Sequence, residues 1–175
     1  SQDKSPEIIE KEYPNIKLIK NKKNIGYCKA QNLAISHSSG EFVIALNLDI
    51  ILDNYFFEEM VIAAQSDPLI GSVAPKLLKL KDGIKTNIID SLGHSISKNR
   101  CATNIGEGRA DCEEFNKAKY IFGVSGAAPL YRRKMMEDIK WDSEYLDEDF
   151  ISGYDDVDID LRSKLLGWKT LYCPK

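Results

Sequence analysis

Apolar residues along the chain switch between helical and extended spacing, and this pattern predicts an open α/β sheet. Residues 6–13 and 27–36 have helical patterns, and the apolar run 41–46 is typical of a strand covered on both faces. A helical segment at 55–65 is followed by an extended one at 71–80. Helices that alternate with strands in this way favour a mostly parallel sheet with flanking helices.

Turn residues and breakers set the remaining boundaries. Pro14 ends the first helix, and residues 16–19 alternate like a short strand ahead of the turn at Asn24 and Gly26. Residues 81–117 have no clear period and predict hairpins and loops over one end of the sheet. The elements predicted beyond them are a strand at 120–125, a break at 126–129, a helix at 132–139, a helix at 155–166 closed by Gly167, and a strand at 168–173.

Composition adds the size and the general chemistry. The chain has 175 residues, of which 43% are hydrophobic and 29% charged, which suits one globular domain. Its formal net charge is -3, so general attraction to nucleic acid is not favoured. None of the four cysteines forms a CxxC pair, which favours reduced, mostly buried thiols and a cytoplasmic location. No apolar run approaches the length of a membrane span.

Two polar side chains interrupt the apolar stretch 40–52, GEFVIALNLDIIL. A carboxylate buried in such a run is costly unless it is paired or bound to a cation. Asn47 and Asp49 follow the strand 41–46 at its carboxyl end, which is where open α/β sheets bind ligands. Asp49 is therefore a candidate ligand for Mg2+ or Mn2+, which favour oxygen. The alternative is that Asp49 caps the turn after the strand.

Four aspartates crowd the start of the helix 155–166, within the sequence YDDVDID. The helix dipole stabilises each of them there by roughly 0.3–1 kcal/mol. Asp158 and Arg162 are spaced to pair across one turn. Asp156 would project from another side of the helix as a candidate general base, and a solvated acidic first turn is the alternative. The apolar positions expected to form the buried stripe are Val157, Leu161 and Leu165.

Two glycine-containing turns are weaker candidates for ligand contact. Residues 24–32 form a turn that runs into a helix, where Gly26 permits close approach of the backbone and the helix start can receive phosphate. Residues 122–128 place small side chains around Gly126, after a strand. Each has a plain structural alternative: a helix-entry turn for the first, and close packing of two elements for the second.

The order of these motifs is more specific than any one of them. The chain contains NIGY and AQN, then GEFVIALNLD, then VSGAAPLYRR, then DEDF and YDDVDIDLR, and finally GW and LYCP. In this order they resemble family 2 glycosyltransferases, most closely the rhamnosyltransferase-like branch. The resemblance spans essentially the whole chain. It implies a GT-A fold with an open, mostly parallel, Rossmann-like sheet, a nucleotide-sugar donor, a divalent metal and inversion at the sugar carbon.

The resemblance also implies roles for individual residues. Asn47-Leu48-Asp49 matches the metal-binding DxD motif, so that Asp49 corresponds to the ligand of Mg2+ or Mn2+. Asp155-Asp156 matches a Glu-Asp pair, in which Asp156 corresponds to the catalytic base that takes a proton from an acceptor hydroxyl. The positions that match substrate-binding residues of the family are Asn24, Gly26, Asn32, Asn47, Gly126 and Asp155.

Three departures from the family pattern bear on activity. Relatives begin with a strand, a helix and a second strand that hold the nucleotide base, of which residues 1–3 resemble only the tail. The chain stops at Lys175, before a His that often completes the metal site. Gln31 replaces an Arg of many relatives, and Lys29 is a candidate substitute. We therefore expect residues 1–175 to form a GT-A domain that is incomplete at its N-terminus and that by itself binds donor poorly and turns over little.

The full-length protein is then expected to be an inverting glycosyltransferase of polysaccharide or glycolipid synthesis. Its partners would be a nucleotide-sugar donor and a saccharide or lipid-linked acceptor, and a cytoplasmic location is compatible with peripheral association at the inner face of the membrane. Two alternatives remain open. A sugar-phosphate nucleotidyltransferase would want a Gly-rich, Lys/Arg-bearing phosphate loop near its start, which this chain lacks. A catalytically silent domain would only bind a partner or a nucleotide.

Overall fold

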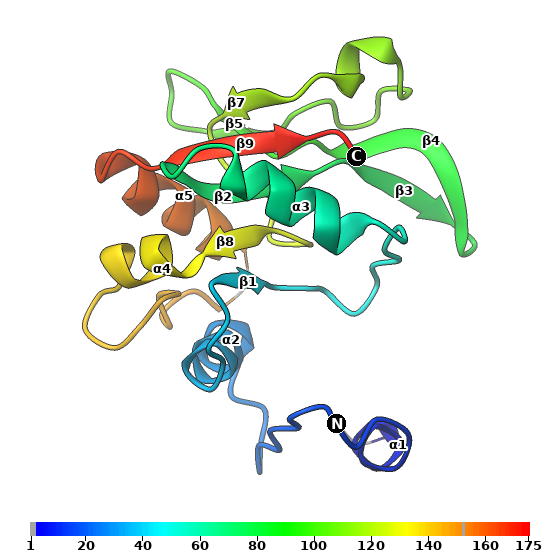
Figure 1. Cartoon of the computed structure of the whole chain (residues 1–175), viewed down its shortest axis with the longest axis vertical. Helices are drawn as coiled ribbons and strands as arrows, with labels where there is room; N and C mark the ends of the chain where they lie inside the picture. Colours follow the sequence, from blue (N-terminus) through cyan, green and yellow to red (C-terminus); the bar gives the residue numbers. More distant parts are fainter. Residues whose placement is uncertain (1–2, 152) are drawn as a thin grey trace.

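A five-stranded sheet forms the centre of the computed structural model, which describes residues 3–151 and 153–175 (Figure 1). The strands follow the order β1-β8-β2-β9-β7. β2 and β9 pair in parallel, whereas β1 with β8, β8 with β2, and β9 with β7 are antiparallel. The α/β class is confirmed, and the sheet is mixed where the sequence predicted a mostly parallel one. The strand bounds are Phe42–Ile44 for β1, Ile70–Pro75 for β2, Lys119–Ile121 for β7, Leu130–Arg132 for β8 and Lys169–Cys173 for β9.

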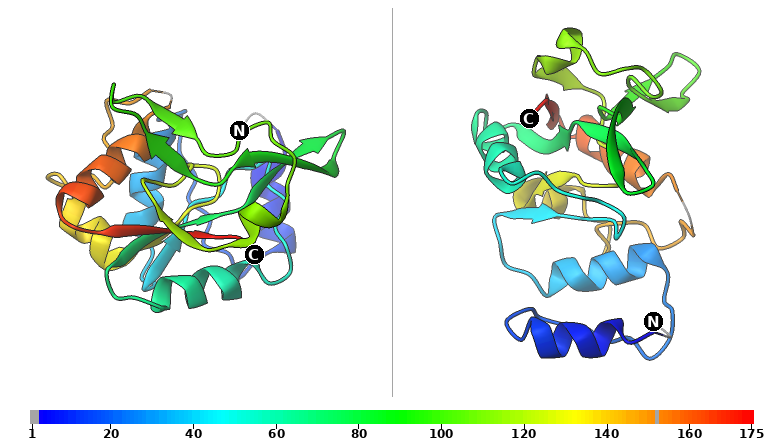
Figure 2. Two further views of the ribbon diagram at one scale, coloured as in Figure 1. Left: turned by 90° about the horizontal axis from the view of Figure 1, so that it is seen from above. Right: turned by 90° about the vertical axis from the view of Figure 1, so that its right-hand side faces the viewer.

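Helices flank the two faces of this sheet (Figures 1 and 2). α3 buries Phe56 in one apolar cluster with Val73 of β2. α4 and α5 belong to a second cluster, in which Ile159 joins Ala74, the strand neighbour of Val73. Val73 and Ala74 point to opposite faces because side chains alternate along a strand. The helix bounds are Ser5–Glu12 for α1, Tyr27–Ser36 for α2, Phe56–Gln65 for α3, Arg133–Ile139 for α4 and Asp155–Leu165 for α5.

The predicted helices are confirmed to within one residue at each end. The break at 126–129 and the last strand, β9, are also confirmed, and Gly167 adopts φ 84° after α5, a backbone angle that favours glycine. The strand predicted at 16–19 is wrong: residues 17–20 have no regular structure, and Ile16 is exposed. Four alternating residues do not hold an extended conformation without a strand to pair with.

Other strand boundaries changed because pairing, rather than apolar length, ends a strand. β1 covers only Phe42–Ile44 of the predicted 41–46 and lies at an edge of the sheet, with Phe42 and Ile44 packed against one apolar cluster and Val43 against the other. β8, at Leu130–Arg132, was missed because three residues give no readable period. The predicted strand 120–125 leaves the sheet after Ile121.

The middle of the chain forms the hairpins that the sequence predicted for residues 81–117. β3 (Leu77–Lys81) pairs with β4 (Ile84–Ser91), and β5 (His94–Ile96) pairs with β6 (Ala102–Asn104). A 3-10 turn at Glu113–Asn116 follows. The apolar side chains that anchor this region to β9 are Ile89, Leu92, Phe115 and Tyr172.

The buried face of α5 differs from the predicted stripe. Leu161 and Leu165 are 42% and 84% exposed, whereas Ile159, Asp160 and Ser163 are buried. The stripe prediction failed because it assumed that a carboxylate faces solvent, and Asp160 is instead 1% exposed. The predicted pair between Asp158 and Arg162 is confirmed, with 2.6 Å between Oδ2 and a guanidinium nitrogen.

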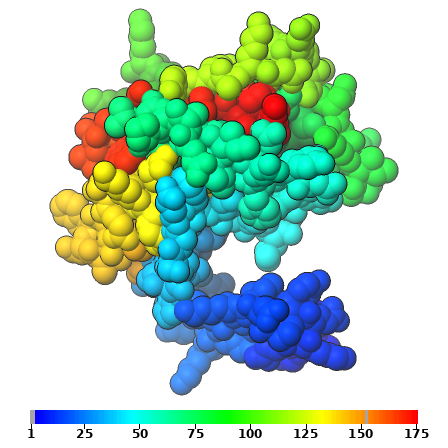
Figure 3. All heavy atoms as spheres, viewed as in Figure 1, coloured from blue at the N-terminus to red at the C-terminus, as the bar shows by residue number. Residues whose placement is uncertain are grey.

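The N-terminal helix lies apart from the rest. α1 buries none of its residues, and Figure 3 shows a gap between it and the body of the molecule. Of the four cysteines, Cys28 and Cys173 are buried, Cys101 and Cys112 are exposed, and all are free thiols. In the part of the chain that the structure describes, no helix is long and apolar enough to cross a membrane.

Candidate active site

Two aspartates of α5 accept hydrogen bonds from the backbone that follows β7. The Gly126 N–H donates to Asp156 Oδ2 at 2.8 Å, and the Val124 N–H donates to both carboxylate oxygens of Asp160, each at 3.1 Å. Asp156 and Asp160 are four residues apart and share one face of the helix. Because these N–H groups face carboxylates, they do not continue the ladder of β7.

Gly123 lets α5 approach this backbone closely. A Cβ atom at Gly123 would overlap the carboxyl group of Asp160. At Gly126 a Cβ would lie 3.2 Å from Asp156 Oδ2, which is tight but not an overlap. The small residues after β7 therefore make room for two carboxylates, and Gly123 is the position where no larger residue fits.

His94, the first residue of β5, lies between the two aspartates. Its Nδ1 is 3.1 Å from Asp160 Oδ2, and its Nε2 is 3.8 Å from Asp156 Oδ2. An ionised carboxylate only accepts hydrogen bonds, so Nδ1 carries the hydrogen and donates to Asp160. The backbone N–H of His94 donates to the Gly123 carbonyl oxygen at 2.7 Å. We call Asp156, His94 and Asp160 the acid–histidine cluster.

Burial and charge oppose each other in the acid–histidine cluster. Burial by itself would lower the pKa of His94, but the hydrogen bond to Asp160 and the charges of Asp156 and Asp160 outweigh it, so this pKa is raised. Burial raises the pKa of Asp160 to about 6, although hydrogen bonds from His94 and the Val124 N–H act in the other direction. In the folded protein both His94 and Asp160 therefore hold a proton more tightly than the isolated side chains do, and the two groups form a hydrogen-bonded pair.

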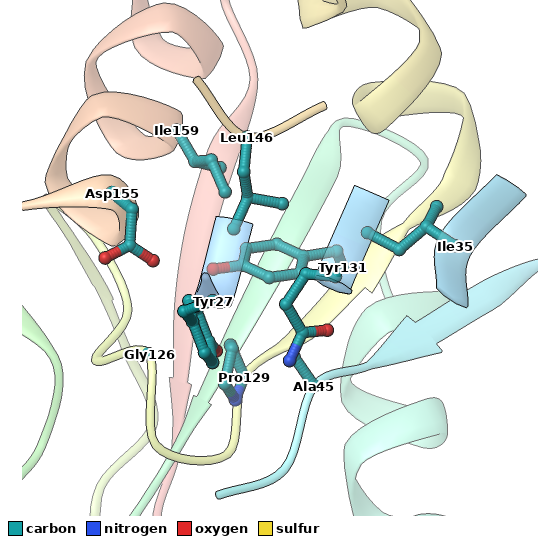
Figure 4. Close-up of a pocket in the computed structure, with 10 residues that line it drawn as sticks. Tyr27, Ile35, Ala45, Gly126, Pro129, Tyr131, Leu146, Asp155 and Ile159 are labelled. Atoms are coloured by element: carbon teal, nitrogen blue, oxygen red, sulfur yellow. The ribbon is translucent and has the colours of Figure 1, made fainter. Parts of the chain in front are cut away.

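Asp155 lines a small hollow next to the cluster, together with Gly126 (Figure 4). The rings of Tyr27 and Tyr131 border the same hollow, whose volume of about 10 Å³ has room for about one water molecule. Burial, together with the charge of Asp156, raises the pKa of Asp155. Burial and the charges of Asp155 and Asp156 raise the pKa of Tyr27 to about 12, so its hydroxyl stays protonated and can donate to a ligand.

Asn47 is brought to this site by its backbone. Its N–H donates to the Ala127 carbonyl oxygen at 2.9 Å, directly after Gly126. The carboxyl end of β1 is thereby fixed beside the segment that holds Asp156. The structure thus brings together four of the predicted site residues, Asn47, Gly126, Asp155 and Asp156.

Asp49 lies in a different and larger cleft of about 880 Å³, between the segment after β1 and the β3–β4 hairpin. Its side chain is exposed, so the argument that burial obliges Asp49 to bind a cation is wrong. Ala128 lines this cleft, while Gly126 lines the hollow, so one short segment borders both. The other charged residues around the cleft are Asp53, Lys76, Lys79, Lys85, Asp90, Asp111 and Lys175.

A metal site made by the protein alone does not fit the described residues. Within 3–151 and 153–175, no three His, Cys, Asp or Glu side chains are arranged to hold a metal ion. Mg2+ is often held by one or two carboxylates together with substrate phosphates. An exposed carboxylate on a broad cleft, as Asp49 is, fits that shared type of site.

The side chain of Asn32 is occupied by protein contacts. Its Oδ1 accepts from the N–H groups of Tyr145 and Leu146 at 3.0 and 2.9 Å, and its Nδ2 donates to the Leu146 carbonyl oxygen at 2.8 Å. Asn32 is 8% exposed. Its contacts are those of a residue that ties α2 to the segment ahead of α5, and contact with substrate stays a prediction.

The turn before α2 has the predicted form. Asn24 Oδ1 accepts from the Gly26 N–H at 2.9 Å, and both residues are exposed. Gln31 lines the hollow beside Asp155, and Lys29 pairs with Glu148 at 3.3 Å. Lys29 therefore already has an acidic partner, and its proposed replacement of a family Arg stays a prediction.

Sequence reasoning missed three residues of the site: His94, Asp160 and Gly123. The four-residue spacing of Asp156 and Asp160 was a usable signal that both lie on one face of a helix. His94 gave no such signal, because it comes from the irregular region 81–117. Its place opposite α5 depends on a backbone pairing with Gly123 that no local pattern reveals.

Comparisons with known proteins identify the fold and the family. A crystal structure of GalNAc-T7 with UDP, GalNAc and Mn2+ is similar over 99% of this chain and 33% of that chain, with a TM-score of 0.69 and 16% identity. A crystal structure of S. aureus TarS 1-349 is similar over 98% of this chain and 46% of that one, with a TM-score of 0.60 and 16% identity. A search of curated proteins gave no match.

This chain thus spans a third of one similar structure and just under half of the other. At such low identity the likeness shows the fold alone, and the predicted GT-A fold class is confirmed. The family model described as glycosyl transferase family 2 matches residues 1–139, well over half of the sequence. The chain belongs to glycosyl transferase family 2.

Proposed function

We propose that Asp156 is the general base of an inverting glycosyl transfer. The observation that carries this proposal is the placement of its carboxylate. Oδ2 accepts from the Gly126 N–H and Oδ1 from the Val157 N–H, both at 2.8 Å, while the side chain remains 21% exposed. These two hydrogen bonds fix the orientation of the carboxylate, and the exposure leaves it accessible to an acceptor hydroxyl.

The proposed reaction is a single in-line displacement. The acceptor hydroxyl gives its proton to the Asp156 carboxylate, and its oxygen forms a bond to the anomeric carbon of the donor sugar. The bond from that carbon to the diphosphate oxygen breaks, and the nucleoside diphosphate leaves with both electrons. Because attack and departure occur on opposite faces of the sugar, the configuration inverts. A sugar hydroxyl needs a base for this step, since it is a weak nucleophile while it keeps its proton.

The donor would lie along the carboxyl end of β1, between the hollow and the cleft. Asn47 and Gly126 would contact it there, with Asp155 at the sugar and the turn of Asn24 and Gly26 on its nucleotide side. In the same proposal Asn32 acts mainly by fixing α2. The GalNAc-T7 structure, which was solved with UDP, GalNAc and Mn2+, supports a nucleotide-sugar donor for this fold.

We also propose that Asp49 binds Mg2+ or Mn2+ together with the donor diphosphate. When bound, such an ion would neutralise the charge of the leaving diphosphate. The finer assignments of the proposal are a rhamnosyltransferase-like enzyme of polysaccharide or glycolipid synthesis, a saccharide or lipid-linked acceptor, and a cytoplasmic location at the inner face of the membrane. They are supported by the resemblance of the motifs.

Asp156→Asn in the full-length protein tests the base. We expect donor binding to be unchanged and transfer to fall by about 10²–10⁴-fold, the usual contribution of a general base. The matched control is Asp138→Asn, because Asp138 is an exposed aspartate on α4. Donor binding would be measured by calorimetry against a panel of nucleotide sugars, and transfer by product formation. If transfer survives the substitution, Asp156 is not the base.

Asp49→Asn tests the shared metal site. We expect the Mn2+-dependent part of donor binding to disappear, while the fold, measured by circular dichroism, is unchanged because the side chain is exposed. Asp53→Asn is the control, since Asp53 lines the same cleft. Donor binding that is equally strong with Mn2+ and with a chelator would refute the role of Asp49.

A further inference from the structure

The cluster around His94 is buried more deeply than a catalytic carboxylate requires. His94 is 7% exposed and Asp160 is 1% exposed. A buried carboxylate costs free energy unless it is paired and hydrogen-bonded, and Asp160 has its hydrogen bonds from Val124 and His94. The proposed transfer gives Asp160 no direct task, because it does not reach the surface. Its position therefore needs another explanation.

The geometry connects Asp160 to Asp156 through one imidazole ring. Nδ1 is fixed by its hydrogen bond to Asp160, which determines the direction of the opposite nitrogen. That nitrogen, Nε2, faces Asp156 Oδ2 at 3.8 Å, the same oxygen that accepts from the Gly126 N–H. A charged Nε2–H at this distance attracts the carboxylate and limits its rotation.

We propose that His94, oriented by Asp160, is a positioning residue that holds the Asp156 carboxylate in its catalytic orientation. The inference rests on the proposed function, because it takes Asp156 as the base. In its protonated form the ring attracts Asp156 Oδ2. When Nε2 loses its proton, its lone pair faces the same oxygen, and the attraction is replaced by repulsion. Catalysis should therefore decline as His94 deprotonates.

The groups that face the ring agree with this assignment. From α5, both Asp156 and Asp160 favour the protonated ring, whereas burial opposes it. The segment 123–126 donates its Val124 and Gly126 N–H groups to Asp160 and Asp156, and its sequence, GVSG, contains no titratable side chain. Burial lowers the pKa of Lys164 and raises that of Tyr131, the charge of Asp160 acts to raise both, and neither residue is among the groups that shift the pKa of His94. Arg162 pairs with Asp158 and donates to the carbonyl oxygens of Ile139, at the end of α4, and Tyr145.

The raised pKa of His94 sets the direction of the pH dependence. Its proton is held more tightly than in the unfolded chain, so the attraction to the Asp156 carboxylate is present while the ring is protonated and is lost as the pH rises through this raised value. The alkaline limb of kcat should follow the same titration. Removing the charge of Asp160 should move both the titration of His94 and the alkaline limb of kcat toward lower pH.

The first test measures the titration of His94 by NMR and needs no activity. His37, exposed at the end of α2, is the only other histidine of the chain, and His37→Gln assigns the two signals. We expect His94 to titrate above the ordinary histidine value in the 175-residue chain, and lower in both Asp160→Asn and Asp156→Asn. The proposal is overturned if wild-type His94 titrates at or below the ordinary histidine value, or if Asp156→Asn leaves the pKa of His94 unchanged.

The second test measures transfer by His94→Gln in the full-length protein. We expect kcat to fall at least tenfold, KM for the donor to stay within twofold, and the alkaline limb to disappear. His37→Gln should leave all three unchanged. A purely structural His94 would lower the melting temperature but keep the alkaline limb, and that result contradicts the inference.

The two tests separate this inference from the proposed function. If Asp156→Asn keeps full transfer while His94 titrates as expected, the cluster exists but Asp156 is not the base. If Asp156→Asn abolishes transfer and His94→Gln has the wild-type pH profile of kcat, Asp156 is the base but His94 does not position it. If His94→Gln does not fold, the NMR titration of His94 in the wild type, Asp156→Asn and Asp160→Asn still tests the positioning role.

Discussion

Replacing the buried carboxylate of Asp160 by an amide should change how stability depends on pH. Asp160→Asn keeps the shape of the side chain and an oxygen that can accept from the Val124 N–H, but it removes the titration. In the wild type the pKa of Asp160 is about 6, against 3.8 for an unburied aspartate. The difference corresponds to about 3 kcal/mol, because each pH unit is worth about 1.4 kcal/mol.

The sign follows from linkage. A pKa raised by folding means that the folded protein binds the proton more tightly, so this stabilisation is full below about pH 3.8 and is lost as the pH rises through about 6. The pKa of His94 is also raised by folding, so its stabilisation of the folded protein is lost as well when the pH rises through that raised value. The wild-type free energy of unfolding should thus fall by up to about 3 kcal/mol between pH 4 and 7, relative to the variant.

Urea unfolding at pH 4, 5, 6 and 7 measures this difference directly. Comparing the two proteins cancels the titration of all carboxylates that they share. The control is Asp138→Asn, an exposed aspartate on α4, which should run parallel to the wild type. If Asp160→Asn also runs parallel to the wild type from pH 4 to 7, then Asp160 does not carry the raised pKa, and the electrostatic account of the cluster is wrong.

Two further substitutions test the packing around the site. Gly123→Ala should destabilise the protein by about 2–4 kcal/mol in urea unfolding, because the new methyl group overlaps the Asp160 carboxyl; Gly126→Ala, with its longer 3.2 Å approach, should cost clearly less, and equal costs would contradict the packing argument. Asn32→Ala should lower the free energy of unfolding by about 2–4 kcal/mol, because it leaves two N–H groups without acceptors. The control, Asn24→Ala at an exposed position, should lower it by less than about 1 kcal/mol. A small effect at Asn32 would argue against its role in fixing α2.

Local signals were reliable where the element itself carries them. The helices 27–36 and 55–65 were readable because their apolar spacing and their flanking breakers are contained in a short window. β8 and the edge position of β1 were not readable, because strand pairing joins residues about ninety positions apart. The same reason explains the false strand at 16–19, which has the local pattern without a partner.

The candidate site divides in the same way. The order of the motifs identified Asp156, Asp155, Gly126 and Asn47, and the structure brings these four together. An apolar run does not by itself mean burial: the chain after β1 runs along an open cleft, and Asp49 is exposed. The contacts of Asn32 were also hidden, since its partners lie more than a hundred residues away.

The sequence by itself determined the family and the fold class and pointed to Asp156 as the candidate base, because these depend on residue types in a fixed order. Only the tertiary structure decided that Asp160 faces inward, that Gly123 makes room for it, and that His94 lies between two carboxylates. Burial, distance and the resulting pKa values arise when segments far apart in the chain pack together. No periodicity within α5 or within residues 81–117 contains that information.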